Sequence, residues 1–146
     1  MKLIFLFFTF LLVNTTNGWL TDFEQAKKIA SEKNEYILLN FSGSDWCGPC
    51  IRMRKEIFES EEFKNYAENH LVLLNADFPR NNKNKLSKEQ QSKNDQLADK
   101  FDPTGKFPLT ILINANGNEI KEWDGLPDAK PADFVKQIVQ AIEKGK

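Results

Sequence analysis

Both cysteines of this 146-residue chain lie in one short segment, Trp46-Cys47-Gly48-Pro49-Cys50. A disulfide between them closes so small a ring that it removes only about 2 kcal/mol of entropy from the unfolded chain, against about 4.7 kcal/mol for a ring of about a hundred residues. A domain of this length buries enough surface to fold without a stabilising disulfide. Reversible redox chemistry is therefore the interpretation that the spacing favours. A structural disulfide and metal binding are the alternatives, although His70, the one histidine, cannot complete a four-ligand zinc site with two cysteines.

The residues around the cysteines predict a strand, a turn and the start of a helix. Residues 36–41 are a compact apolar run, typical of a buried strand, and residues 42–45 are turn formers. Pro49 suits the first turn of a helix, where its missing N–H costs nothing. The apolar positions of that helix recur at helical spacing: Cys50, Met53, Ile57 and Phe58. We therefore expect Cys50 to face inward and Cys47 to lie at the exposed end.

The start of a helix is a favourable place for a thiolate. Unpaired N–H groups and the positive end of the helix dipole stabilise negative charge there, so we expect the pKa of Cys47 to fall. A fall of this pKa from about 8.5 to about 7 raises the thiolate fraction at neutral pH about fifteenfold. The thiolate is then about fivefold less nucleophilic, so the rate of attack rises only about threefold. The larger effect is that Cys50 lies close enough for intramolecular attack.

Composition places the chain among single-domain soluble globular proteins, with 40% hydrophobic and 28% charged residues. Its 20 Lys and Arg against 21 Asp and Glu give a net charge of −1. This balance leaves no basic excess to neutralise a phosphate backbone, so nucleic acid is not expected as a partner.

Residues 1–18 have the pattern of a secretory signal peptide. Lys2 gives a positive start, residues 3–13 are an apolar run with one threonine, and residues 14–18 are polar and small. The run is shorter than the roughly 20 residues that span a bilayer, which favours cleavage after Gly18 over an uncleaved anchor. We therefore expect a signal peptide at 1–18 and an exported domain at 19–146, periplasmic or secreted, with no cysteine at its start to carry a lipid.

The Trp-Cys-Gly-Pro-Cys segment at the mouth of a helix, after a buried strand and with Pro108 ahead of a later strand, resembles the thioredoxin family. The resemblance covers nearly all of the chain after residue 18. It implies an α/β thioredoxin-like fold, in which a central mixed β-sheet is flanked by helices in the order αβαβαββα. Gly125 matches the family's glycine near the active site, and Asn116-Gly117 signals a hairpin. The expected elements are a helix at 21–33, strands at 36–41, 71–77, 109–113 and 119–123, and helices that open at the cysteines, at Ser87 and at Pro131.

The resemblance also implies roles for the residues around the cysteines. Pro108 is expected to have a cis peptide bond and to pack against the cysteines, with an ordinary trans proline as the alternative. The backbone of Phe107 is expected to pair with an extended substrate segment. Trp46 is either a rim residue of the substrate site or an ordinary aromatic. Gly48 and Pro49 complete the expected substrate-binding set, and as a pair they are similar to the reducing branch of the family.

The chain departs from the family pattern beneath the second cysteine. Asn40 stands where many thioredoxins have a buried aspartate, and Leu73 where a lysine often accompanies it. Asparagine cannot accept a proton, so we expect water, or Asp45 at the rim, to assist deprotonation of Cys50. A hydrogen-bonded strand asparagine with no catalytic part is the alternative. The loop before the motif is also one residue longer than usual, and Leu109 replaces a common threonine after the proline.

Residues 79–85 have almost no apolar side chains and are expected to form an exposed loop. A solvated insertion is one interpretation of this loop. A basic surface that recognises an acidic protein is the other, although Glu89, Asp95 and Asp99 follow it and dilute its field. His70 is expected to be a surface residue at a helix end and not a metal ligand.

Together these features predict an exported thiol-disulfide oxidoreductase that reduces protein disulfides. The Cys47 thiolate attacks, a mixed disulfide forms, and Cys50 releases the reduced product. We expect a monomer with no metal and no cofactor beyond the Cys47–Cys50 disulfide. Electrons must come from a second dithiol protein, membrane-bound or soluble, because no flavin or nicotinamide motif is present. The alternatives are a disulfide oxidase or isomerase, and a non-catalytic module that binds protein or a soft metal.

Overall fold

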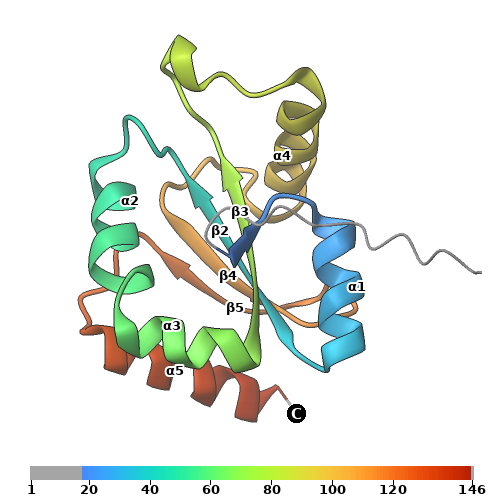
Figure 1. The fold of residues 1–146 in the computed structure, drawn as a ribbon, viewed down its shortest axis with the longest axis vertical. Helices are drawn as coiled ribbons and strands as arrows, with labels where there is room; N and C mark the ends of the chain where they lie inside the picture. Colours follow the sequence, from blue (N-terminus) through green and yellow to red (C-terminus); the bar gives the residue numbers. More distant parts are fainter. Residues whose placement is uncertain (1–17, 146) are drawn as a thin grey trace, which may run out of the picture.

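The computed structural model describes residues 18–145, so residues 1–17 of the predicted signal peptide lie outside the described residues. The strands are β1 (Trp19–Leu20), β2 (Tyr36–Ser42), β3 (Leu71–Asp77), β4 (Leu109–Ile113) and β5 (Glu119–Asp124). The helices are α1 (Phe23–Lys33), α2 (Gly48–Met53), the π-helical turn η2 (Arg54–Phe58), α3 (Glu61–His70), the 3-10 turn η3 (Asn82–Asn84), α4 (Lys88–Phe101) and α5 (Pro131–Lys144). Helices cover both faces of the sheet that the strands form (Figure 1).

The five strands form one mixed sheet in the order β1-β3-β2-β4-β5. β3 pairs in parallel with β1 and β2, whereas β4 pairs antiparallel with β2 and β5 antiparallel with β4. The central strands β2 and β4 are buried along almost their whole length, as expected for strands covered on both faces. One core lies between the sheet and the helices α1 and α4, and a second lies between the sheet and α2, η2, α3 and α5.

The predicted fold is confirmed, with two additions. The helix that opens at the cysteines ends at Phe58, and α3 follows as a separate helix because Ser60 caps it. The Ser60 hydroxyl accepts the N–H of Phe63 at 3.2 Å. The second addition is β1, whose two residues pair with Leu73 and Leu74. A strand of two residues is too short to show an alternating pattern, so the sequence could not indicate it.

The predicted starts of three helices are confirmed to within two residues. α4 begins after Ser87, whose hydroxyl accepts a first-turn N–H at 3.1 Å, and α5 begins at Pro131. The first helix begins at Phe23 and not at residue 21, because Asp22 is its cap and accepts a first-turn N–H at 2.8 Å. His70 is the exposed last residue of α3, as predicted.

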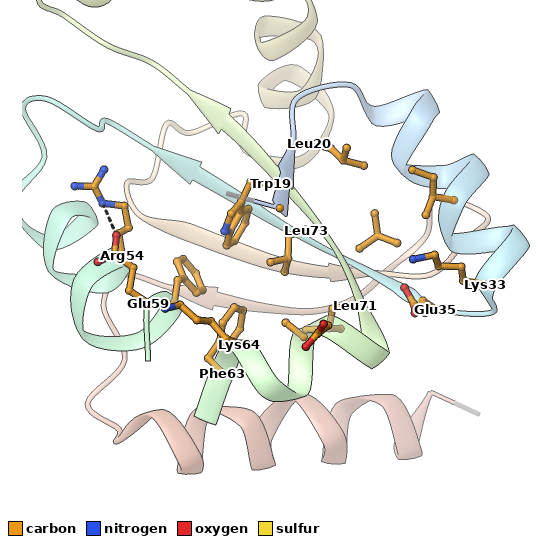
Figure 2. A pocket seen from close by; sticks show the side chains of 16 residues that line it. Trp19, Leu20, Lys33, Glu35, Arg54, Glu59, Phe63, Lys64, Leu71 and Leu73 are labelled. Carbon is orange, nitrogen blue, oxygen red and sulfur yellow. Dashed lines mark ion pairs between the residues drawn. The ribbon is translucent and has the colours of Figure 1, made fainter. Parts of the chain in front are cut away.

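A groove of about 760 Å³ lies beside β1, between α1 and α3 (Figure 2). Trp19 and Leu73 lie along it, and Arg54 and Glu59 form an ion pair of 3.6 Å beside them. Neither cysteine lines this groove. Three of its lining residues, Trp19, Arg54 and Phe58, also line a smaller pocket that reaches Cys50, so the groove adjoins the site of the two sulfur atoms.

Candidate active site at the disulfide

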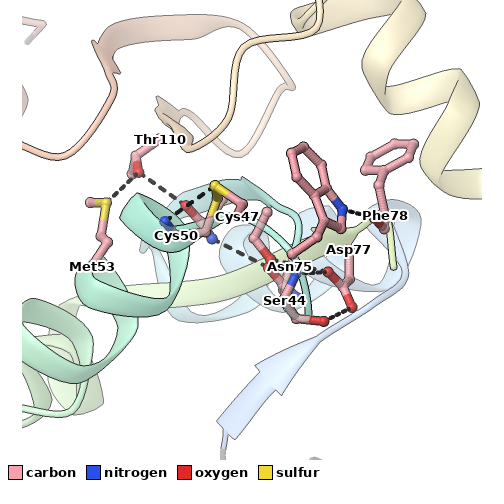
Figure 3. Close-up of a disulfide and its surroundings, with 11 residues drawn as sticks. Ser44, Cys47, Cys50, Met53, Asn75, Asp77, Phe78 and Thr110 are labelled. Atoms are coloured by element: carbon pink, nitrogen blue, oxygen red, sulfur yellow. Dashed lines mark hydrogen bonds between the residues drawn. A yellow bond between two sulfur atoms is a disulfide. The ribbon is translucent and has the colours of Figure 1, made fainter. Parts of the chain in front are cut away.

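Cys47 and Cys50 form a disulfide at the start of α2 (Figure 3), with their Cα atoms 5.2 Å apart. Cys47 is the N-cap residue of this helix. Its sulfur accepts the N–H of Cys50 at 3.3 Å, and its own N–H donates to the carbonyl of Gly43 at 2.9 Å. The Cys47 sulfur is therefore held at an N–H group for which the helix supplies no carbonyl partner.

The prediction that Cys47 lies at the exposed end of the helix is wrong for the disulfide form. Only 5% of Cys47 is exposed, which equals the exposure of Cys50. The bond to Cys50 holds the Cys47 sulfur against the first turn of α2, whereas Gly48 and Pro49 are exposed. These two intervening residues are the part of the motif that a partner can contact from solvent.

Trp46 joins the active-site turn to two other segments of the chain. Its indole Nε1 donates to the carbonyl of Phe78 at 2.7 Å, and its ring meets that of Phe107 edge to face at 5.4 Å between centroids. The guanidinium of Arg80 lies 3.6 Å from the centroid of the Trp46 ring. Trp46 is half-buried, so one part of the indole packs against neighbouring residues while another stays accessible at the surface.

The peptide bond between Phe107 and Pro108 is cis, as predicted from the position of this proline. Pro108 is buried, and its carbonyl accepts the N–H of Gly125 at 2.9 Å. Gly125 has φ +79°, a conformation that favours glycine. The ring of Phe107 also packs against that of Phe78, at 5.6 Å between centroids. Packing of Pro108 on the cysteines stays a prediction.

Asp102 is the first residue of the loop that leads from α4 to the cis proline. It is 3% exposed, and its Oδ1 accepts the backbone N–H of Lys106 at 2.8 Å. Its Oδ2 is buried and has no hydrogen-bond partner among the described residues. Burial raises the pKa of Asp102 above its usual range. The sequence pattern gave no sign of this buried carboxylate, which holds the segment just before Phe107.

Asn40 lies in β2 and lines a pocket together with Cys50. It is 7% exposed, its Oδ1 accepts the hydroxyl of Thr110 at 3.2 Å, and its Nδ2 donates to Asn75 Oδ1 at 3.4 Å. Asn75 and Thr110 are the residues opposite Asn40 on the two neighbouring strands. Asn40 therefore has the hydrogen bonds of an ordinary strand asparagine and also adjoins the second cysteine.

A pocket of about 280 Å³ opens beside Asn40 and Cys50. It is large enough and polar enough to hold water. None of the described residues that line it is acidic: they are Trp19, Thr21, Asn40, Ser42, Ser44, Cys50, Ile51, Arg54, Phe58 and Asn75.

Asp45 is engaged by the loop that follows β3. Its carboxylate accepts the backbone N–H groups of Arg80 and Asn81 and the side-chain amide of Asn84, each at 2.9 Å. The N–H of Arg80, followed by the Asn84 amide, holds the pKa of Asp45 below its usual value. A carboxylate with a lowered pKa is a weaker base, so this geometry favours an anchoring role for Asp45 over proton transfer.

Asp77, at the end of β3, is a site residue that sequence reasoning missed. Its Oδ1 accepts the N–H of Ser44 at 2.9 Å and the hydroxyl of Ser42 at 3.2 Å, and its Oδ2 accepts the Ser44 hydroxyl at 2.5 Å (Figure 3). The local sequence pattern indicates a turn at the two serines but not their contact with a residue on another strand. Asp77 thus fixes the turn that leads into the cysteines.

Residues 18–145 are the part of the chain that the structure describes. This part of the chain contains no group of three or more His, Cys, Asp or Glu side chains placed to hold a metal ion. Its helices are all too short or too polar to cross a membrane.

The fold and the disulfide at the start of α2 define a class of protein that comparison with known sequences confirms. The model of the thioredoxin-like domain family matches residues 23–142, and the chain belongs to this family. A solved structure titled DsbH oxidoreductase superposes with a TM-score of 0.78 at 30% identity, over 91% of this chain and 92% of that one. A Thermus thermophilus thioredoxin, 16% identical with a TM-score of 0.64, covers 85% of this chain and 86% of that one and shares the fold.

Two curated proteins of Chlamydia pneumoniae are similar in sequence. The disulfide bond reductase DsbH is 34% identical over 121 residues, which cover 83% of this chain and 70% of DsbH. The thioredoxin-related protein DsbJ is 32% identical over 102 residues, which cover 70% of this chain but only 28% of DsbJ. With its paired Cys47 and Cys50, the chain is a thiol-disulfide oxidoreductase.

Proposed function

We propose that this chain is an exported reductase of protein disulfides, in which Cys47 attacks the substrate and Cys50 resolves the intermediate. The observation that carries the assignment of roles is the N–H of Cys50, which donates to the Cys47 sulfur at 3.3 Å. A hydrogen bond of this kind and the helix dipole stabilise a thiolate at Cys47 more than at Cys50. The 34% identity to a disulfide bond reductase supports the reducing direction.

The proposed reaction is two successive exchanges. The Cys47 thiolate attacks one sulfur of the substrate disulfide, the substrate S–S bond breaks, and the first substrate thiolate leaves. Cys50 then loses its proton and attacks the Cys47 sulfur, which breaks the mixed disulfide and releases the second substrate thiolate. The substrate gains two electrons, and the chain ends with the Cys47–Cys50 disulfide. A dithiol protein must reduce this disulfide before the next cycle.

The proposed substrate contacts surround the disulfide. The backbone of Phe107 pairs with an extended segment of the substrate, next to the cis proline. Trp46 and Phe107 touch edge to face and form one wall of this contact, while Gly48 and Pro49 form the exposed tip. Pro108, which has no N–H, leaves the disulfide free of a competing backbone donor.

We assign the proton of Cys50 to water in the pocket beside Asn40, and not to Asp45. The pocket of about 280 Å³ reaches Cys50, whereas both oxygens of Asp45 accept N–H groups from the loop after β3. Asn40 positions this water through its amide and does not take the proton itself. The export of the chain is proposed from the sequence pattern of residues 1–18.

Replacing Asn40 with aspartate is expected to change the pH dependence of reduction. The new carboxylate would be buried, so its pKa would rise above its usual value and it would act as a base for Cys50 only above that pKa. A raised pKa in the folded state also means that the variant loses stability as the pH rises through it. The expected results are an added step in the pH–rate profile and a melting temperature that falls, relative to wild type, as the pH rises above about 4, the ordinary pKa of an aspartate.

The matched control is Asn116→Asp, which adds the same charge to an exposed turn. This variant should keep the wild-type pH–rate profile and the wild-type pH dependence of the melting temperature. An Asn40→Asp profile that coincides with wild type would count against a place for Asn40 beside the proton path.

The direction of the reaction is tested by a glutathione redox titration of the Cys47–Cys50 pair. We expect a potential near −270 mV, as in reducing thioredoxins. A potential above about −150 mV would instead identify an oxidase. The fraction of disulfide is measured by alkylation of free thiols and mass spectrometry across a series of glutathione buffers.

A further inference from the structure

Residues 79–88, here called the basic loop, carry four cationic side chains and no acidic one: Arg80, Lys83, Lys85 and Lys88. All four are exposed, and none pairs with a carboxylate in the described part of the chain. The next acidic residue, Glu89, pairs with Lys93 at 3.2 Å. The basic loop is therefore a local concentration of unpaired positive charge on a chain whose net charge is −1.

The basic loop is tied to the active site by Asp45, which lies two residues before Cys47. The three N–H groups that reach this carboxylate come from Arg80, Asn81 and Asn84. Figure 1 shows the loop beyond the end of β3, at the same end of the sheet as the turn before α2. Because the Asp45 carboxylate is occupied by backbone and amide donors, the cationic side chains of the loop stay available to a partner.

Arg80 is the cation of the basic loop that contacts the active-site segment. Its guanidinium lies 3.6 Å from the centroid of the Trp46 ring, and Trp46 immediately precedes Cys47. Contact with an aromatic face holds a guanidinium in place and leaves its N–H donors free at the edge. Those donors match the two oxygens of a carboxylate. Trp46 also touches Phe107, the residue proposed to pair with substrate backbone.

We propose that the basic loop is a docking surface for acidic segments of protein substrates. Arg80 receives a carboxylate close to the substrate cysteine, and Lys83 and Lys85 receive acidic residues further along the same segment. This inference rests on the proposed function, because a substrate that presents its disulfide to Cys47 comes to lie beside Trp46 and Arg80. A protein is favoured over an anionic membrane because Arg80 contacts the residue that precedes Cys47, and because Asp45 holds the basic loop to the active-site turn.

The test uses three peptides that share one disulfide and differ only in whether glutamate, glutamine or lysine flanks it. The second-order rate constant for their reduction by the reduced chain is measured at about 20 mM and about 500 mM salt, between which the screening length falls from about 20 Å to about 4 Å. We expect the glutamate peptide to react about tenfold faster than the glutamine peptide at low salt, which corresponds to about 1.4 kcal/mol. This advantage should disappear at high salt.

The variant Arg80→Gln/Lys83→Gln/Lys85→Gln should bring the ratio of the glutamate and glutamine rates close to one. Its matched control, Lys28→Gln/Lys33→Gln/Lys144→Gln, removes three exposed lysines on α1 and α5 and should keep the wild-type ratio.

Equal rates of wild type on all three peptides, or an equal loss in the control, would overturn the docking surface. Reduction of the glutamine peptide would still uphold the reductase in that case, so the two proposals fail separately. Co-sedimentation of wild type with vesicles that contain anionic lipid, without any preference among the peptides, would overturn the proposal in favour of a membrane surface.

Discussion

Replacing Cys47 with serine is expected to lower catalysed disulfide reduction by at least about a thousandfold, because a serine hydroxyl does not ionise near neutral pH and cannot replace the thiolate. The Cys47 sulfur sits at the N-cap of α2, where the N–H of Cys50 donates to it. Serine fits the same place and caps helices well, so the fold should survive. The measurement is the reduction of insulin by dithiothreitol, followed by turbidity.

Cys50→Ser is the matched variant for this experiment. It keeps the attacking sulfur but removes the resolving one, so the reaction should stop at a mixed disulfide between Cys47 and the substrate. Mass spectrometry of the trapped adduct locates the bond. The assignment of roles would be reversed if Cys47→Ser trapped the adduct through Cys50. It would be lost altogether if neither variant trapped one and Cys47→Ser kept wild-type activity.

Replacing Gly43 with alanine is expected to lower the free energy of unfolding by about 1–3 kcal/mol through overpacking. A Cβ built on Gly43 lies 2.3 Å from Cε2 of Trp46 and 2.6 Å from Cζ2, well inside van der Waals contact. The indole would have to move, which breaks its hydrogen bond of 2.7 Å to Phe78. The carbonyl of Gly43 also accepts the N–H of Cys47, so the shift reaches the sulfur pair. Urea unfolding measures the first effect, and the KM for a disulfide peptide measures the second.

Two controls make the Gly43 experiment specific. In a Trp46→Ala background the added methyl group meets no indole, so Gly43→Ala should cost much less there than in wild type. Gly48→Ala adds a methyl group where nothing lies within 4 Å, and it should leave stability within about 0.5 kcal/mol. If Gly43→Ala lowered the free energy of unfolding equally in both backgrounds, a clash with the Trp46 indole would not be the cause of the loss.

The regular elements of this fold could be predicted because their signals are local. β3 and β4 have the predicted bounds, and β4 is an unbroken apolar run because it is buried on both faces of a covered sheet. α4 and α5 begin where Ser87 and Pro131 indicate, because capping depends on residues within one turn. The position of the disulfide at a helix start followed from the same kind of signal.

The supports of the site could not be predicted, because each joins segments that are far apart in sequence. Asp77 contacts Ser44 across 33 positions, and Asp45 contacts the basic loop across 35 to 39. Local periodicity carries no information about such pairs. The burial of Cys47 could not be predicted from local pattern either, because it depends on the bond to Cys50 and on how the neighbouring side chains pack.

These long connections have a consequence for when the protein becomes reactive. The side-chain hydrogen bonds that tie the turn before Cys47 to the rest of the chain span 32 to 39 positions, so none of them exists in a short peptide or in a nascent chain that stops before β3. In such a chain the two thiols are ordinary cysteines with pKa values of about 8.5. The helix-start environment that lowers the pKa of Cys47 and holds Cys50 beside it therefore forms only together with the tertiary structure.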